Sequence, residues 1–253
     1  MTLLVVASVA GAPGATRLAL GLAASWPALD RRRRIVVEAD PDGGRLGAEL
    51  GTGVEPGLMA LALASRTSGL AGDDLVERGA APVGDWHLVP APASSEQTYS
   101  ALVHAAGTLA AVMAADRQDP GGPVWIVDAG RLSARSPALP FAKAADHVLV
   151  VSGGSFPALQ LVPHRVEALR TAGCAVSVVV VEPTSWATDE IAEFVAADVI
   201  TVLPQVKARG EGVAAMRGNH WRPWWRRVEE AASYLDRSSR PAVAPIVADG
   251  VAP

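Results

Sequence analysis

Short, continuous apolar runs recur along the chain, and stretches with helical character lie between them. Uninterrupted apolar runs of this length are typical of strands covered on both faces, as in a parallel sheet. The alternation predicts an α/β fold, in which a mostly parallel, doubly wound sheet forms the middle of three layers. The predicted strands are Leu3–Ala7, Ile35–Glu38, Trp125–Asp128, Val148–Ser152, Val176–Val181 and Val199–Leu203, with a weaker one at Trp86–Val89. The predicted helices are Thr16–Trp26, Leu58–Ala64, Thr98–Ala115, Leu159–Ala172 and Asp189–Ala196.

The loop after the first predicted strand has the glycines of a phosphate-binding loop. Gly11 and Gly14 follow the strand, and Thr16 opens the next helix. Such a loop aims backbone N–H groups and a helix N-terminus at phosphates, while a lysine adds positive charge and a Ser or Thr hydroxyl holds magnesium. Here the lysine position holds Ala15, and Pro13 has no N–H to offer. Two lost hydrogen bonds to a charged group, roughly 1.5–3 kcal/mol each, weaken phosphate binding by about two to four powers of ten.

Acidic residues end two further strands. Glu38, Asp40 and Asp42 follow or close the second strand, and the strand "VWIVD" ends in Asp128. Ligands of open α/β sheets bind at the carboxyl ends of strands, where acids can hold magnesium or orient a water. A capped turn is the alternative for the first group, because Asp-Pro-Asp-Gly-Gly is strong turn chemistry.

Taken together, these segments resemble the MinD/ParA group of deviant Walker A ATPases. The group's loop sequence KGGVGKTT aligns with "AGAPGATR" at 10–17, and its acidic turn with "EADP" at 38–41. A hydrophobic strand ends in Asp128, another strand covers 145–152, and a late strand ends in Leu203-Pro204. The segment "LVPAP" at 88–92 and the loop without lysine are most similar to the CpaE/TadZ branch, whose members place pilus or secretion machinery.

The resemblance implies a site for ATP or ADP with Mg²⁺ between two subunits. The implied cofactor-binding residues are Gly11, Ala12, Pro13, Gly14, Ala15, Thr16, Arg17 and Pro204, and the implied metal ligands are Thr16, Glu38, Asp40 and Asp128. Asp40 matches the group's residue that orients the attacking water. Both lysines of the group's loop are absent, at Ala10 and Ala15, and the first of them normally reaches the partner subunit's phosphates.

Three functions compete at this point. The first is a MinD/ParA-like scaffold that localises or regulates a larger assembly, with weak or absent ATP hydrolysis and weak or no nucleotide binding. The second is a slow, ATP-dependent dimerising switch in which Arg17, Arg45 or Arg131 replaces the lost lysine charge. The third is a Rossmann-type NAD(P) oxidoreductase, with Glu38 as the ribose-binding acid. The third glycine of that fingerprint is missing.

The C-terminal third contains a tryptophan- and arginine-rich stretch, "HWRPWWRRVEEAASYLDR". Pro223 is expected in the first turn of a helix, and Val228, Ala231 and Leu235 recur at helical spacing. This helix either packs its apolar side on the sheet or contacts a membrane surface or a partner. The run of arginines at 31–34 is interpreted as a solvated turn before the second strand.

Composition narrows the class of protein. The chain of 253 residues is half hydrophobic, so we predict a single domain over 1–237, ending in a helix at about 221–237, and a flexible proline-rich tail at 238–253. A net charge of −4 argues against a broad nucleic-acid-binding face. One cysteine, Cys174, cannot form an internal disulfide.

The expected location is the cytoplasm, without a signal peptide and with peripheral binding at the inner face of the membrane as an option. The expected partners are a second copy at the loop face and a protein of secretion, pilus or division machinery.

Overall fold

The computed structural model describes residues 2–10, 14–27, 32–66, 69–115, 121–206, 216 and 218–239. Within these ranges eight strands form one sheet in the order β3-β4-β2-β5-β1-β6-β7-β8. All neighbouring pairs are parallel except β3 and β4. The strands are β1 (Thr2–Ser8), β2 (Arg34–Glu38), β3 (Ala81–Val83), β4 (Trp86–Val89), β5 (Val124–Arg131), β6 (His147–Gly153), β7 (Val176–Val181) and β8 (Val199–Leu203).

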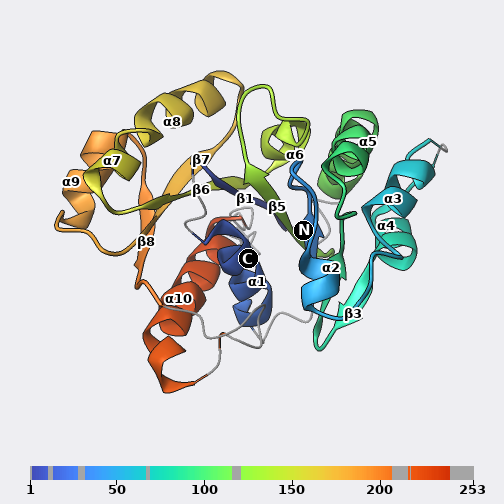
Figure 1. Cartoon of the computed structure of the whole chain (residues 1–253), viewed down its shortest axis with the longest axis horizontal. Helices are drawn as coiled ribbons and strands as arrows, with labels where there is room; N and C mark the ends of the chain where they lie inside the picture. Colours follow the sequence, from blue (N-terminus) through green and yellow to red (C-terminus); the bar gives the residue numbers. More distant parts are fainter. Residues whose placement is uncertain are drawn as a thin grey trace, which may run out of the picture.

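Helices cover both faces of this sheet (Figure 1). They are α1 (Ala15–Ser25), α2 (Leu46–Glu49), α3 (Leu58–Ala64), α4 (Gly72–Gly79), α5 (Ser95–Ala115), α6 (Leu139–Ala144), α7 (Phe156–Leu159), α8 (Val162–Thr171), α9 (Thr188–Val195) and α10 (Arg222–Ser238), with a short 3₁₀ turn at Asn219–Trp221. Successive residues of β1 face opposite layers: Leu3 and Val5 pack with α5, α6 and α8, while Leu4 and Val6 pack with α1 and α10. Every residue of β1 is buried, which explains its uninterrupted apolar sequence.

The predicted fold class is confirmed: the described residues form a mostly parallel, three-layer α/β sheet. All predicted strands are present, and Val176–Val181, Val199–Leu203 and Trp86–Val89 match to the residue. The sequence analysis missed β3, α2, α4 and α6. Three of them, β3, α2 and α6, are three to six residues long and too short to show a clear hydrophobic period. The fourth, α4, is eight residues long, and its sequence GDDLVERG has only two large apolar residues.

The helix predicted at Leu159–Ala172 is present as α8 (Val162–Thr171), but Leu159 instead ends a separate short helix, α7 (Phe156–Leu159). Each has a proline in its first turn, Pro157 and Pro163. Proline lacks the N–H that would continue the hydrogen bonds of the preceding turn, so Pro163 lies in the first turn of a new helix instead of extending α7.

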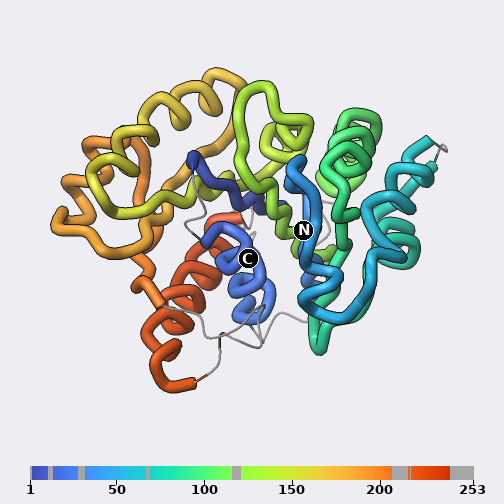
Figure 2. The backbone as a smooth tube through the Cα atoms, viewed as in Figure 1, coloured from blue at the N-terminus to red at the C-terminus, as the bar shows by residue number. Residues whose placement is uncertain are grey.

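The tryptophan-rich helix α10 lies beside α1, although the two are far apart in the sequence (Figure 2). Trp221 and Trp224 are buried in the core between α10 and the sheet, with their rings edge to face at 5.5 Å. Trp225 is partly buried, and its indole N–H donates to the Met216 carbonyl at 2.8 Å. The structure therefore favours core packing over a membrane-surface helix, because the aromatic side chains that would enter lipid are already buried.

The sequence analysis interpreted the arginine run as a solvated turn, but the structure shows that one of these arginines is buried and that three of them have acidic partners. Arg32 is buried, and its guanidinium donates to Asp236 of α10 at 2.6 Å and to the Thr2 hydroxyl at 3.1 Å. Arg33 pairs with Asp73, and Arg34 with Asp85. Charge runs predict solvent exposure only where no acidic partner is packed against them. Of the predicted tail, 240–253 lies outside the described residues, while Ser238 ends α10.

Among the described helices, only α5 is long and apolar enough to cross a membrane by length and composition. Its inner side, including Leu102, Leu109 and Met113, is part of the core against the sheet. Packing of this kind is typical of a core helix.

The close contact between α1 and α10 can be tested with a matched pair of glycine substitutions. A Cβ at Gly21 would lie 2.5 Å from the Trp224 ring, whereas a Cβ at Gly107 in α5 would meet no atom within 4 Å. We expect Gly21→Ala to lower the free energy of unfolding by about 1–3 kcal/mol through overpacking. Gly107→Ala should raise it by roughly 0.5–1 kcal/mol through helix propensity. Urea denaturation measures both, and equal effects of the two changes would contradict the packing of α10 on α1.

Candidate functional site

Strand order brings the predicted site segments together at one edge of the sheet. β5 lies between β1 and β2, so Asp128 in β5 sits between the start of α1 and the acidic turn. In register, Asp128 is the neighbour of Val6 on one side and of Glu38 on the other. A pocket of about 340 Å³ opens there, lined by residues of α1, the acidic turn and the end of β5.

The start of α1 forms one wall of this pocket. Gly14 precedes the helix with φ +103°, a conformation that other residues adopt only with strain, and its carbonyl accepts the Leu18 N–H at 2.9 Å. Ala15, Thr16 and Arg17 follow, and all three line the pocket with Gly14. The other predicted loop residues, Gly11, Ala12 and Pro13, lie outside the described residues.

Asp128 is the most deeply buried acid of the site. Its carboxylate accepts hydrogen bonds from the Thr16 hydroxyl and from the Gly130 N–H, the latter at 3.3 Å. Burial raises the pKa of Asp128 to about 6; the two hydrogen bonds oppose this rise, and the charges of Asp40 and Glu38 add to it. Asp128 is thus a carboxylate whose charge the protein does not fully compensate.

Asp40 lies over the backbone of Gly130. Its Oδ1 accepts the Asp42 N–H at 3.0 Å, which folds the acidic turn back on itself. A Cβ at Gly130, which has φ +56°, would collide with the Asp40 carboxylate. Burial raises the pKa of Asp40, as does the nearby charge of Asp42, while Arg131 and Arg45 lower it.

Glu38 lines the pocket and is held by backbone hydrogen bonds. Its Oε1 accepts the N–H groups of Arg45 at 2.7 Å and Leu46 at 2.9 Å, and its Oε2 accepts the N–H of Ala91 at 2.9 Å. Burial raises the pKa of Glu38 although these bonds favour the ionised form. Because both oxygens are engaged, this carboxylate ties the end of β2 to two neighbouring segments, and we leave it out of the metal ligands proposed below.

Three arginines line the pocket: Arg17 of α1, Arg45 before α2, and Arg131 at the end of β5. These are the residues that the sequence analysis nominated as substitutes for the missing lysine. Arg45 also pairs with Glu49 at 3.1 Å. Ala15, at the lysine position, is buried in the core while still lining the pocket.

Some predictions do not meet at the pocket. Pro204 follows β8 and is not among the pocket-lining residues. Within the described residues, no three His, Cys, Asp or Glu side chains form a group that could hold a metal ion by themselves. Magnesium commonly takes only one or two carboxylates and completes its shell with water and phosphate oxygens, so a smaller donor set does not argue against it.

Three pocket residues were not proposed from the sequence as part of the site: Ser8, Gly43 and Gly130. The Ser8 hydroxyl donates to the Gly130 carbonyl at 3.3 Å and thereby links the ends of β1 and β5. The glycine directly after "VDA" was a usable signal, because a glycine next to a strand end often marks a close approach of another group.

Comparisons with known proteins show the fold. No protein-family model matches the chain, and no curated protein matches it. The chain is similar to the solved structures of a ParA family ATPase from Chlorobium tepidum (14% identity, TM-score 0.64), MinD with Mg-ADP from Pyrococcus horikoshii (13%, 0.66) and the MinC:MinD complex of Aquifex aeolicus (13%, 0.67). These alignments cover 94%, 94% and 95% of this chain and 98%, 97% and 98% of the other chains. The fold is that of the MinD/ParA ATPases.

This topology contradicts the Rossmann alternative. In the Rossmann order the first two strands are neighbours, whereas here β5 separates β1 from β2. The proposed ribose-binding acid, Glu38, already accepts three backbone N–H groups. The NAD(P) interpretation is therefore wrong on both grounds.

The raised pKa of Asp128 predicts a pH dependence of stability. The folded state binds this proton more tightly than the unfolded chain, where the carboxyl has its usual pKa of 3.8. In metal-free buffer the contribution of this group to the free energy of unfolding should fall by roughly 3 kcal/mol as the pH rises from about 4 to about 7. We expect Asp128→Asn to reduce this slope in urea titrations at several pH values, while Glu38 and Asp40, whose pKa values are also raised, keep the remainder. The exposed control Asp198→Asn should leave the slope unchanged, and an undiminished slope in Asp128→Asn would contradict the burial of a proton-binding carboxyl.

Proposed function

We propose that this protein is a MinD/ParA-like regulator that localises or organises a larger assembly, and that it binds nucleotide weakly and hydrolyses ATP slowly or not at all. One observation carries the proposal. The site keeps the Thr16–Asp128 pair, on which a magnesium ion would depend, but holds a buried alanine where a lysine would face the phosphates.

The described residues fit a magnesium nucleotide on the metal side. Asp128 is an under-compensated carboxylate with a hydroxyl hydrogen-bonded to it, and a divalent cation would lower its pKa by supplying the missing positive charge. When bound, magnesium would neutralise phosphate charge. Thr16 and Asp128 would hold it, and the start of α1 would present N–H groups to the phosphates.

The fit is poor on the phosphate side. Ala15 has no cation, and its side chain packs with core residues of α1 and the sheet. A nucleotide would have to obtain positive charge from the arginines at the rim, whose long side chains lose conformational freedom when they bind. This cost supports weak binding over a tight, rapidly cycling site.

A slow ATP-dependent switch is the second candidate, and the three pocket arginines favour it. Arg131 lies close enough to Asp40 to lower its pKa. In this version Arg17, Arg45 and Arg131 supply the phosphate charge, and Asp40 orients the attacking water. Two copies would then meet at the loop face.

The proposed partner is a protein of a secretion, pilus or division machine, as in the CpaE/TadZ branch. The MinD of Aquifex aeolicus was solved together with MinC, which is a protein partner. The proposed location is the cytoplasm, with peripheral attachment through the partner because the aromatic side of α10 is buried.

Calorimetric titration with ATP and with ADP, each with and without Mg²⁺, tests the proposal. We expect a millimolar dissociation constant or no binding, and no appreciable phosphate release. Micromolar binding with steady turnover would overturn the proposal in favour of the switch. Magnesium-dependent binding should then disappear in both Thr16→Ala and Asp128→Asn.

Restoring the lysine gives a sharper prediction. Ala15→Lys should tighten Mg-ATP binding by about tenfold to a hundredfold, because it adds a hydrogen bond to a charged group. Ala15→Met is the matched control, since it adds similar length without charge. If both variants bind ATP like the parent chain, the pocket does not face phosphates at position 15, and the assignment of the loop is wrong.

A further inference from the structure

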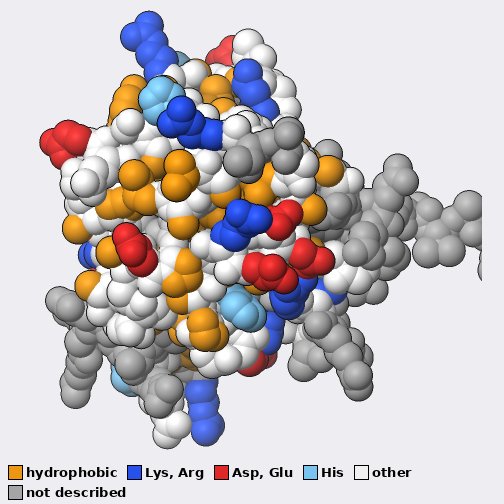
Figure 3. All heavy atoms as spheres, turned by 90° about the vertical axis from the view of Figure 1, so that its right-hand side faces the viewer, with side chains coloured by type: hydrophobic (Ala, Val, Ile, Leu, Met, Phe, Trp, Pro, Cys, Tyr) orange, Lys and Arg blue, Asp and Glu red, His pale blue; other side chains and the backbone are white. Residues whose placement is uncertain are grey.

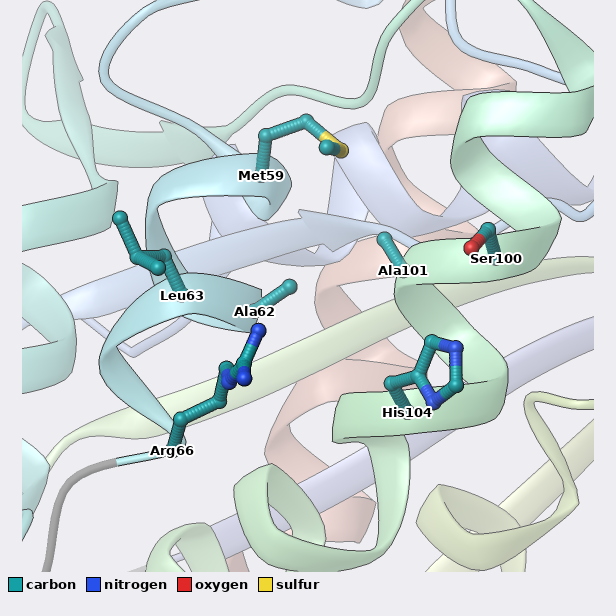
Figure 4. A pocket seen from close by; sticks show the side chains of 7 residues that line it. All are labelled: Met59, Ala62, Leu63, Arg66, Ser100, Ala101 and His104. Atoms are coloured by element: carbon teal, nitrogen blue, oxygen red, sulfur yellow. The ribbon is translucent and has the colours of Figure 1, made fainter.

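A second and larger pocket lies between α3 and α5, away from the glycine loop. Its volume is about 530 Å³, and it is lined by Met59, Ala62, Leu63 and Arg66 on the α3 side and by Ser100, Ala101 and His104 on α5. Met59 and Arg66 extend from the α3 side toward the gap between the helices (Figure 4). On the side of the molecule that carries α3, hydrophobic side chains reach the surface among charged ones (Figure 3).

The two helices that flank this groove expose unusually large apolar side chains. On α3, Met59 is 44% exposed and Leu63 is 69% exposed; on α5, Tyr99 is 52% exposed and Val103 is 54% exposed. Each pair is four residues apart and therefore lies on one helix face. Of these four side chains, Met59 and Leu63 line the groove, and an exposed apolar pair beside a groove between two helices is suited to helix-in-groove recognition.

The polar groups of the groove indicate the charge of its occupant. Arg66 and His104 are the titratable residues among its lining side chains, and no acid lines it. Within the part of the chain that the structure describes, Arg66 forms no salt bridge. A second copy of the same groove would bring two Arg66 side chains together across a two-fold axis, which disfavours self-pairing.

We propose that the α3–α5 groove docks an amphipathic helix of a protein partner that carries acidic residues beside its apolar stripe. The apolar stripe covers Met59, Ala62 and Leu63, and a carboxylate pairs with Arg66. This inference rests on the proposed function, because it gives the regulated partner its place on the fold. The groove does not share a lining residue with the nucleotide pocket.

The segment Pro90–Pro92 connects this groove to the nucleotide pocket. The Leu58 N–H at the start of α3 donates to the Pro90 carbonyl at 2.8 Å, and the Thr98 hydroxyl in α5 donates to the Pro92 carbonyl at 2.9 Å. Between them, the Ala91 N–H donates to Glu38 at 2.9 Å. A partner in the groove therefore contacts α3 and α5, and both helices are hydrogen-bonded to the Pro90–Pro92 segment that also donates to Glu38.

The test uses two synthetic helical peptides and the full chain, without nucleotide. Both peptides have a leucine stripe at i, i+4, i+7 spacing; one carries Glu beside it and the other carries Lys at the same positions. Fluorescence anisotropy measures their dissociation constants. We expect the Glu peptide to bind about tenfold or more tightly than the Lys peptide. Equal binding of the two peptides, or no binding of either, would overturn the proposal.

Variants locate the binding on the groove. Leu63→Ser should weaken the Glu peptide by about tenfold or more, and Arg66→Glu should reverse the preference toward the Lys peptide. Leu161→Ser is the matched control, since Leu161 is 48% exposed and is not a lining residue of the groove. Equal weakening by the control would contradict the site. Leu63-dependent dimerisation in sedimentation would overturn the partner as occupant.

The nucleotide titration described above is a separate measurement. Peptide binding without nucleotide binding would support partner docking at the α3–α5 groove and would show that the pocket beside α1 does not bind nucleotide. Nucleotide binding without peptide binding would reject docking alone, so the two failures can be told apart.

Discussion

The burial of one carboxylate, Asp128, is the constraint on which the site depends. The insertion of β5 between β1 and β2 puts this acid next to both the start of α1 and the acidic turn. Burial there makes its charged form costly, and Thr16 and Gly130 compensate only part of that cost. A chain without use for a cation at this point would gain stability from a neutral residue. The proposed magnesium binding depends on this partly compensated charge.

Much of the fold follows from hydrophobic pattern alone. Strands buried on both faces must be apolar throughout, so runs such as Val176–Val181 could be predicted to the residue. Short helices such as α6 and α2 carry too few turns for a period to emerge. Arg32 shows the other limit, because its exposure depends on Asp236, which is two hundred and four positions away in sequence.

The candidate site was predictable in composition but not in the roles of its members. Strand ends of a parallel sheet share one edge, so Thr16, Asp40 and Asp128 could be grouped before the structure was known. The role of Glu38 depends on where the backbone of Ala91 and Leu46 passes, which no local pattern encodes. An acidic residue at a strand end can either bind a metal ion or hold neighbouring backbone segments together, and its hydrogen-bond partners distinguish the two roles.

The hydrogen bonds of Glu38 link the pocket to the 90–93 segment, and this linkage does not depend on ATP hydrolysis. A Cβ at Gly57 would lie 2.5 Å from the Pro90 carbonyl oxygen, and one at Gly43 would lie 2.6 Å from that of Ala93. Packing this close transmits displacement, because well-packed backbone does not deform gradually. Any ligand that moves Glu38 would shift the 90–93 segment and, with it, the starts of α3 and α5. Neither tight nucleotide binding nor rapid hydrolysis is required for this linkage. A partner that binds one position of the 90–93 segment more tightly than another is sufficient to shift the equilibrium between them.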